Sequence, residues 1–289
     1  MKEMRFKISE CPNNMSIWDY IRTKSQILKY YSMKPDCDSF DVMSLQHSFD
    51  IPKLIDIVKD MTTRFEQRGW NSSNGPDKYY RGLSLVYNPD YVEDVDRNYQ
   101  TLGTARNANT QFFYGQMQNF ATIRNSYFDS YAFRKPSPCV TETGFYDFIK
   151  GFKRHSIRSR IATVFSKNIT PEAREKGGWH KDEVVFENLR INIPITTDET
   201  FLFEVVDKPK HHLAIGNVYS WDTNIPHRVV VTSDEDRSRT HIVLGFSPWF
   251  DYDEEDDAYV SNEFFGELHP FDMLLGGHVH PGITGLKPY

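Results

Sequence analysis

The second half of the chain contains a series of short segments with the composition of β-strands, separated by turn-rich connections. They cover residues 159–166, 189–196, 200–206, a run around 213–221, 228–232 and 240–246. β-Branched and aromatic residues are frequent in these segments, as in strands that are at least half buried. Strands of this length and spacing are typical of a sandwich or barrel rather than of a sheet built from βαβ units. We therefore expect a mostly β core.

The first third of the chain has a more mixed pattern. Apolar residues recur at helical spacing over 17–31, and again over 51–61, where Asp50 is the expected cap and Pro52 lies in the first turn. Three further expectations are a turn-rich loop over 71–77, a strand over 80–87 and a short helix over 141–152.

These patterns predict three parts. An α/β region over residues 1–140 is expected to pack on a β core over 141–255, and a C-terminal tail over 256–289 to cover part of that core. The acidic run 251–257 is expected to be a solvated loop.

Charge and cysteine content exclude several classes of function. Lysine and arginine total 34 against 40 aspartate and glutamate, so the formal net charge is -6 and gives no overall attraction to a phosphate backbone or an anionic membrane. The 3 cysteines have no spacing that suggests a disulfide framework or an all-cysteine zinc site. No apolar run approaches the roughly 18 residues of a membrane span, and the N-terminus lacks a signal-peptide core. We expect a cytoplasmic protein that binds neither membrane nor nucleic acid.

The strongest chemical signal is an H-x-D sequence followed by a distant histidine. His180 and Asp182 are separated by one residue, and His227 lies 47 residues after His180 (227 − 180). On an extended segment, residues i and i+2 point the same way, so a third ligand from a neighbouring strand can complete a 2-His-1-carboxylate triad. Such a triad holds Fe(II) on one face and leaves the other positions open. An isolated H-x-D also arises by chance, so the surrounding sequence matters.

Four segments around these residues add a longer pattern. In order, they are RINIPI at 190–195, AIGNVYSWD at 214–222, RVVVTS at 228–233 and RSRTHIVL at 237–244. With the H-x-D and the distant histidine, they resemble the aspartyl/asparaginyl β-hydroxylase family of Fe(II)/2-oxoglutarate-dependent oxygenases, which also includes proline hydroxylases that keep an H-x-D. The likeness runs from about residue 159 to 250, about a third of the chain.

The resemblance implies a fold and a set of site residues. The fold would be a double-stranded β-helix (a jelly roll, cupin-like) with an α/β N-terminal region, and His180, Asp182 and His227 would bind Fe(II). The family places an arginine about ten residues after the second histidine, opening the last core strand, where it pairs with the far carboxylate of 2-oxoglutarate. The count favours Arg237 and the strand phase favours Arg239; we prefer Arg239.

Two further residues match the family in part. Arg190 and Asn192 stand where the family has an R-x-H pair near the cosubstrate. Asn192 replaces the histidine, and an amide can hydrogen-bond a carboxylate but cannot titrate. Alternatively, both residues are outward polar positions of a strand.

The implied activity is hydroxylation of an amino acid, a peptidyl side chain or another small molecule, with Fe(II), 2-oxoglutarate and O2 as metal and cosubstrates. The alternative is a cupin-like module that binds a metal, or serves a structural role, without catalysis; such a module needs no arginine opposite the metal. A third possibility, oxidation of a nucleobase or a nucleic-acid-bound protein, needs the basic cluster of residues 150–160 to face the metal.

Several other features have commonplace interpretations beside functional ones. His278 and His280 are expected to lie in a mobile, glycine-rich tail, although they could bind a second metal or cover the site. The loop 168–178 and this tail are the candidate lids. Trp221 is expected in the core. A solvated helix face is expected for the basic cluster, which consists of Lys150, Lys153, Arg154, Arg158 and Arg160.

Overall fold

The computed structural model describes residues 4–12, 15–25, 32–38, 41–69, 80–90, 129–167, 169–176 and 178–286. Within these ranges strands are the dominant element, and every pair of neighbouring strands is antiparallel. The expected mostly β composition is confirmed. None of the helices in these ranges is both long enough and apolar enough to cross a membrane.

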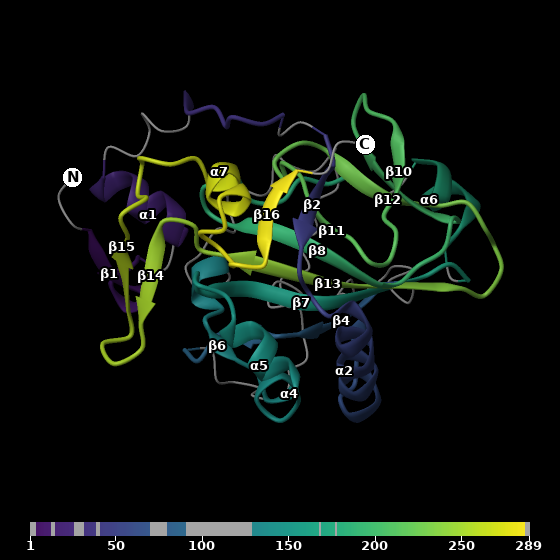
Figure 1. Cartoon of the computed structure of the whole chain (residues 1–289), viewed down its shortest axis with the longest axis horizontal. Helices are drawn as coiled ribbons and strands as arrows, with labels where there is room; N and C mark the ends of the chain where they lie inside the picture. The colour runs from purple at the N-terminus through teal and green to yellow at the C-terminus, as the bar shows by residue number, and fades with distance from the viewer. Residues whose placement is uncertain are drawn as a thin grey trace.

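An eight-stranded sheet forms the centre of the molecule (Figure 1). Its order is β16-β2-β11-β8-β13-β7-β4-β3. The strands are β2 (Met43–His47), β3 (Arg68–Gly69), β4 (Tyr80–Ser84), β7 (Ser156–Phe165), β8 (Leu189–Thr196), β11 (Val218–Ser220), β13 (Ser238–Phe246) and β16 (Ile283–Leu286). Strands from the first 140 residues and from the C-terminal segment therefore join the same sheet as the strands of residues 141–255.

A small sheet of three strands lies against one face of the large sheet. Its order is β10-β9-β12, with β10 at Lys210–His212, β9 at Phe201–Val205 and β12 at His227–Val231. Two small apolar clusters join the sheets. One contains Val164 of β7 with residues of β9 and β12, and the other contains Tyr219 of β11 with Phe203 of β9.

Helices cover the opposite face of the large sheet. They are α2 (Ile51–Arg64), α4 (Pro138–Thr141) and α5 (Phe145–Lys150), which Figure 1 shows on the side away from β10 and β12. The Asp50 side chain caps α2 by accepting from the Lys53 amide, as the sequence predicts. The apolar stripe of α2 packs into the same buried cluster as Ile242 and Leu244 of β13.

The remaining elements lie around this two-sheet unit. β1 (Arg5–Lys7), β15 (Ala258–Ser261) and β14 (Phe250–Asp253) form a three-stranded sheet, and β5 (Val86–Tyr87) pairs with β6 (Lys135–Pro136). The helices are η1 (Ile8–Glu10), α1 (Ile17–Lys24), η7 (Ser130–Ala132), α6 (Pro171–Lys176) and α7 (Pro270–Leu275).

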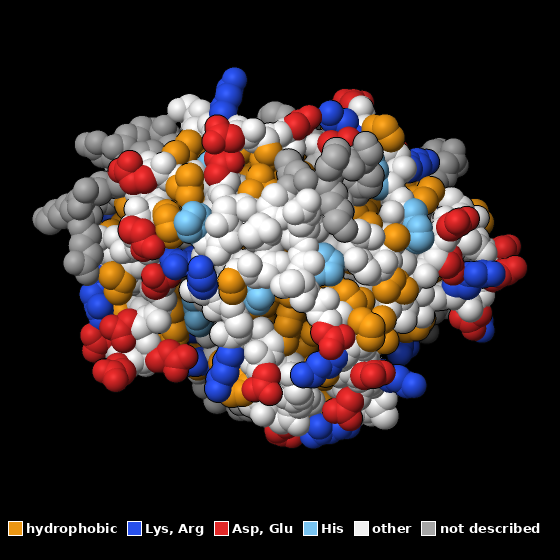
Figure 2. Space-filling model, in the orientation of Figure 1, with side chains coloured by type: hydrophobic (Ala, Val, Ile, Leu, Met, Phe, Trp, Pro, Cys, Tyr) orange, Lys and Arg blue, Asp and Glu red, His pale blue; other side chains and the backbone are white. Residues whose placement is uncertain are grey.

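The acidic run 251–257, expected as a loop, belongs to a β-hairpin. It ends β14 and forms the turn before β15. Asp253 and Asp256 pair with Arg5, and Asp257 pairs with the buried Arg134. Figure 2 shows acidic side chains gathered at this hairpin. These pairs place positive charge from distant parts of the chain beside the acidic run.

The C-terminal segment also differs from the expected mobile tail. Val279 is fully buried, and β16 pairs with β2 at the edge of the large sheet. The Lys153 amide donates to the Val279 carbonyl (2.8 Å), which ties the segment to the end of α5. Packing of this kind fixes a glycine-rich stretch that its composition alone would leave loose.

Other boundaries differ locally. The helix expected over 141–152 is divided into α4 and α5 at Gly144, and the strand expected over 80–87 is interrupted at Leu85 between β4 and β5. The loop expected over 168–178 contains the short helix α6. Residues 26–31 of the first expected helix, and the expected loop 71–77, lie outside the described residues.

Candidate metal centre

His180 and His227 face each other across a backbone bridge. The His180 amide donates to the His227 carbonyl (3.1 Å), and the His227 amide donates to the His180 carbonyl (3.0 Å). His227 is the first residue of β12. Gly178 has a φ of 83°, which side-chain-bearing residues rarely adopt, and this turn leads the chain into the bridge. The ring centroids of the two histidines are 4.4 Å apart.

Both imidazoles are oriented by nearby backbone. His180 Nδ1 donates to the Gly178 carbonyl (2.7 Å), and His227 Nδ1 donates to the Ile225 carbonyl (2.8 Å). Because a carbonyl oxygen only accepts, each Nδ1 carries the proton and each Nε2 keeps a free lone pair. This tautomer allows each histidine to bind a metal through Nε2.

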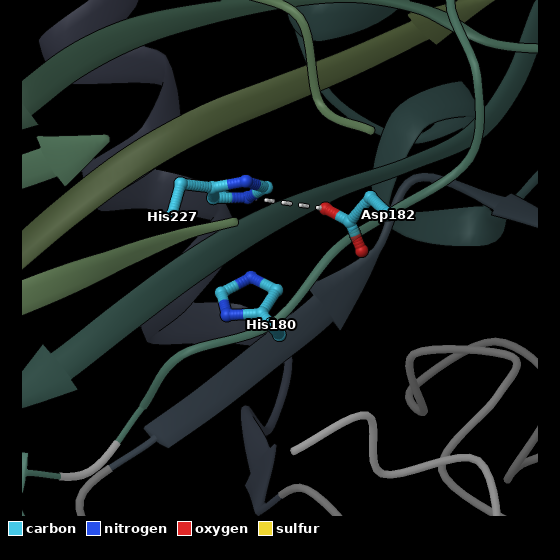
Figure 3. Close-up of side chains that lie close together, drawn as sticks. All are labelled: His180, Asp182 and His227. Atoms are coloured by element: carbon cyan, nitrogen blue, oxygen red, sulfur yellow. Dashed lines mark ion pairs between the residues drawn. The ribbon is translucent and has the colours of Figure 1, made fainter. Parts of the chain in front are cut away.

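Asp182 completes the group. Its amide donates to the Thr223 carbonyl (2.8 Å), and its Oδ2 lies 3.7 Å from His227 Nε2. One ligand atom from each of the three residues lies within 4.8 Å of the others, and Figure 3 shows the side chains directed toward a common point. Across the described part of the chain, no other set of three or more His, Cys, Asp or Glu side chains converges in this way.

The electrostatics keep Asp182 and His180 in the protonation states that bind cations. Burial alone would raise the pKa of Asp182, but the Arg190 guanidinium, followed by the two histidines, holds that pKa well below its usual value. Burial, and then the proximity of His227, lowers the pKa of His180 to about 4. Near neutral pH the site therefore offers a carboxylate and an uncharged imidazole from this segment.

Arg190 lies in β8 and is 3 % exposed. The match of Arg190 to the family's R-x-H pair predicted a place near the cosubstrate; the partners observed in the structure are carboxylates. One guanidinium nitrogen donates to Asp182 and the other terminal nitrogen donates to Glu183. Glu183 in turn pairs with Arg158. Sequence reasoning did not single out Glu183, although its position directly after Asp182 was a possible signal.

Arg239 and Arg237 have opposite environments. The Arg239 residue is 8 % exposed, and its Nε and Nη2 each lie 2.8 Å from a ring nitrogen of His241. Burial lowers the pKa of Arg239 to about 10, and that of His241 well below its usual value, so the arginine is charged and the histidine neutral. Arg237 is exposed and pairs with Asp198 (3.0 Å) and Glu235.

Arg239 shares one face of the large sheet with other polar side chains. Val243, two positions after His241 on β13, lies opposite Arg160 of β7 on one side and Asn192 of β8 on the other. Cross-strand neighbours project from the same face. This is the face covered by the small sheet, so Asn192 is an inward polar residue and not an outward one.

Aromatic side chains border the metal centre on the side of β9. The Phe203 ring centroid lies 5.6 Å from that of His227, and the Trp221 centroid lies 5.8 Å from it. Trp221 is 6 % exposed and packs on Phe203 at 4.1 Å. It therefore belongs to the core, as expected, and also flanks His227.

The basic cluster does not form one solvated face. Arg154 pairs with Asp251, and the Lys150 ammonium lies over the Tyr146 ring. Arg158 is instead largely buried and pairs with Glu183. The Arg160 Nε donates to the Tyr80 hydroxyl (3.3 Å). The tail histidines are packed on aromatic rings, His278 on Phe264 and His280 on Phe152.

The sequence matches no protein-family model and no curated protein. Among solved structures, the chain is similar to dioxygenase for auxin oxidation 1 from Arabidopsis thaliana, in a binary complex with 2-oxoglutarate. That match has a TM-score of 0.32 and 15% sequence identity, and it covers 68% of this chain and 80% of the other. A likeness at this level does not establish a shared fold.

Proposed function

We propose that this chain is an Fe(II)- and 2-oxoglutarate-dependent dioxygenase that hydroxylates an amino acid, a peptidyl side chain or another small molecule. The observation that carries the proposal is the convergence of His180, Asp182 and His227, with their ligand atoms within 4.8 Å of one another. Two histidines and one carboxylate are the donor set of non-haem Fe(II) oxygenases.

The strand connections support a double-stranded β-helix for the core. β7, β8, β11 and β13 are neighbours in the large sheet, whereas the His180 bridge, β12, β9 and β10 lie in the small one. From β7 to β13 the chain passes repeatedly between the two sheets. Two antiparallel sheets connected in this way are the arrangement of a jelly roll. In that fold the metal would lie between the sheets, near the ends of the strands.

The donor geometry fits a metal ion. Both Nε2 atoms keep lone pairs because both Nδ1 atoms donate to carbonyls, and the carboxylate of Asp182 is ionised. Second hydrogen bonds of this kind fix ring orientation in metal sites. When bound, Fe(II) would supply the oxidation of 2-oxoglutarate and of a substrate C–H bond by O2. The chain's own residues would hold the ion, orient the cosubstrate and keep bulk water out.

Arg239 fits the far carboxylate of 2-oxoglutarate. Its guanidinium is buried beside a neutral imidazole, and none of the carboxylates in the described ranges forms an ion pair with it. A buried charge without a counter-ion is costly, and a guanidinium can bind a carboxylate with two parallel hydrogen bonds. A module that only binds a metal has no use for such a group, so Arg239 favours the oxygenase over the non-catalytic alternative.

Turnover of the cosubstrate tests the proposal directly. The protein would be purified without oxygen, loaded with Fe(II), and assayed for succinate formation from 2-oxoglutarate, alone and with pools of amino acids and peptides. We expect succinate only with Fe(II) and O2, more of it with an active pool, and none from His227→Ala. If the wild-type protein binds metal but forms no more succinate than His227→Ala under any condition, the oxygenase assignment is wrong and the metal-binding module is favoured.

A further inference from the structure

Several partners fix the position of Glu183, the residue after Asp182. One carboxylate oxygen accepts from the Ser130 hydroxyl (3.0 Å) and pairs with Arg158, while the other accepts from Arg190. Its carbonyl accepts from the Thr223 hydroxyl (2.6 Å). The side chain is 12 % exposed. A buried carboxylate with partners on both oxygens has one defined position.

An irregularity in β7 brings Arg158 to this carboxylate. Val243 pairs with Arg160 and Gly245 pairs with Ile157, so β7 has one residue more than β13 at this point. Arg158 lies in this bulge and has a φ of 42°, which is unfavourable for any residue with a β-carbon. Bulges next to functional sites commonly redirect a side chain. Here the redirected guanidinium fixes Glu183.

Arg190 is the link between Glu183 and the metal centre. Its Nη1 donates to Asp182 and its Nη2 donates to Glu183, so its two terminal nitrogens serve two different carboxylates. Arginine and a carboxylate often form a two-pronged pair in which both oxygens accept. In such a pair on Asp182, Oδ1 as well as Oδ2 would accept from Arg190 and both would be less available to a metal ion, whereas in the structure Arg190 donates to Oδ2 alone.

We propose that Glu183 is a positioning residue that keeps Arg190 from closing a two-pronged salt bridge on Asp182. By binding the second terminal nitrogen of Arg190, Glu183 leaves Asp182 with one strong donor, which orients the carboxylate, and with an oxygen available to a cation. Arg158 and Ser130 act one step further out by fixing Glu183. This inference rests on the proposed metal centre, and it concerns how that centre is kept open.

Metal affinity provides the test, and it needs no turnover. Binding of Mn(II) would be measured by the electron paramagnetic resonance signal of the free ion in wild-type protein, in Glu183→Gln and in Glu183→Asp. Loss of an outer partner of a metal ligand typically weakens binding 10- to 100-fold, and we expect about that loss for Glu183→Gln. The shorter carboxylate of Glu183→Asp should give an intermediate value. Glu204→Gln is the matched control, because Glu204 forms a similarly buried pair with Arg228 and does not contact Asp182.

A double-mutant cycle separates positioning from simple destabilisation. If Glu183 acts through Arg190, Glu183→Gln should change Mn(II) affinity less than twofold in an Arg190→Gln background. The same loss in both backgrounds, or wild-type affinity in Glu183→Gln, would overturn the inference while leaving the metal centre intact. A wild-type protein that binds no Mn(II) would overturn the proposed metal centre and the inference with it.

Discussion

The two faces of the eight-stranded sheet carry opposite kinds of side chain, although both come from the same strands. On one face Ile242 and Leu244 of β13 are fully buried against the helices. On the other face the same strand presents Arg239 and His241 toward the small sheet. Alternation along a strand makes this division possible, because successive residues point to opposite faces. Folding is therefore expected to depend on one face and chemistry on the other.

Leu244→Ala should give the largest effect on folding. Leu244 is fully buried on the helix-covered face, and Leu→Ala at such positions costs about 2 to 5 kcal/mol because a cavity remains. Chemical denaturation would measure the loss. Mn(II) affinity of the folded variant should stay within about twofold of wild type. A large change in that affinity would show that the two faces are not independent.

Arg239→Gln tests the opposite face. We expect the affinity for 2-oxoglutarate to fall by about 2 to 3 kcal/mol, which corresponds to roughly 30- to 150-fold, since a buried charge partner is lost. Isothermal titration with Mn(II)-loaded protein in the absence of oxygen would measure it. The free energy of unfolding should not fall, because the described carboxylates leave this buried guanidinium without an ion pair. A loss of stability with unchanged affinity would make Arg239 a structural residue.

The difference between the faces also separates what the sequence could predict from what it could not. Strand alternation places Arg239 and His241 on one face, and the i, i+2 spacing places His180 and Asp182 on one side of an extended segment. These are local rules. The role of Glu183 was not predictable in this way, because it depends on a one-residue bulge at Arg158. A bulge is set by how two strands distant in sequence pair, and neither strand reveals it alone.

Long-range pairing explains the other differences as well. β16 was not expected, since its partner β2 lies more than 200 residues away and its own glycine-rich sequence predicts a loose segment. The acidic composition of residues 251–257 predicted a loop in place of the β14–β15 hairpin. The sequence does not show that Arg5 and Arg134 pair with this run. In contrast, Asp50 caps the helix that follows it within one turn, and the sequence was sufficient there.

A pH titration should reveal the buried imidazole on the polar face. Burial lowers the pKa of His241 well below the ordinary value of 6.5. Below about pH 6.5 this histidine is therefore protonated in the unfolded chain while it is still neutral in the native protein. The stability that this contributes is fully present above about pH 6.5 and is lost as the pH falls, by about 1.4 kcal/mol for each pH unit. His155, whose pKa is lowered to about 3 by burial, acts in the same direction. Between pH 6 and 5, His241→Gln should reduce the slope of the free energy of unfolding against pH by the amount that one bound proton contributes. Denaturation at each pH would measure this slope. An unchanged slope would mean that the His241 environment is more polar than its burial suggests.

Arg237→Ala should have the smallest effect, and it distinguishes the two arginines that the sequence could not separate. Arg237 is exposed, and its partners Asp198 and Glu235 lie at or near the surface. Solvent screens ion pairs between exposed side chains, so we expect no measurable change in the free energy of unfolding. Affinity for 2-oxoglutarate should be unchanged, because the Arg237 guanidinium is already paired with two carboxylates in the turn before β13. It does not share the buried environment of Arg239. The same anaerobic titration used for Arg239→Gln provides the comparison. If Arg237→Ala weakens 2-oxoglutarate binding more than Arg239→Gln does, the cosubstrate contact belongs to Arg237; the metal centre would be unaffected, but the polar face of the sheet would no longer account for cosubstrate binding.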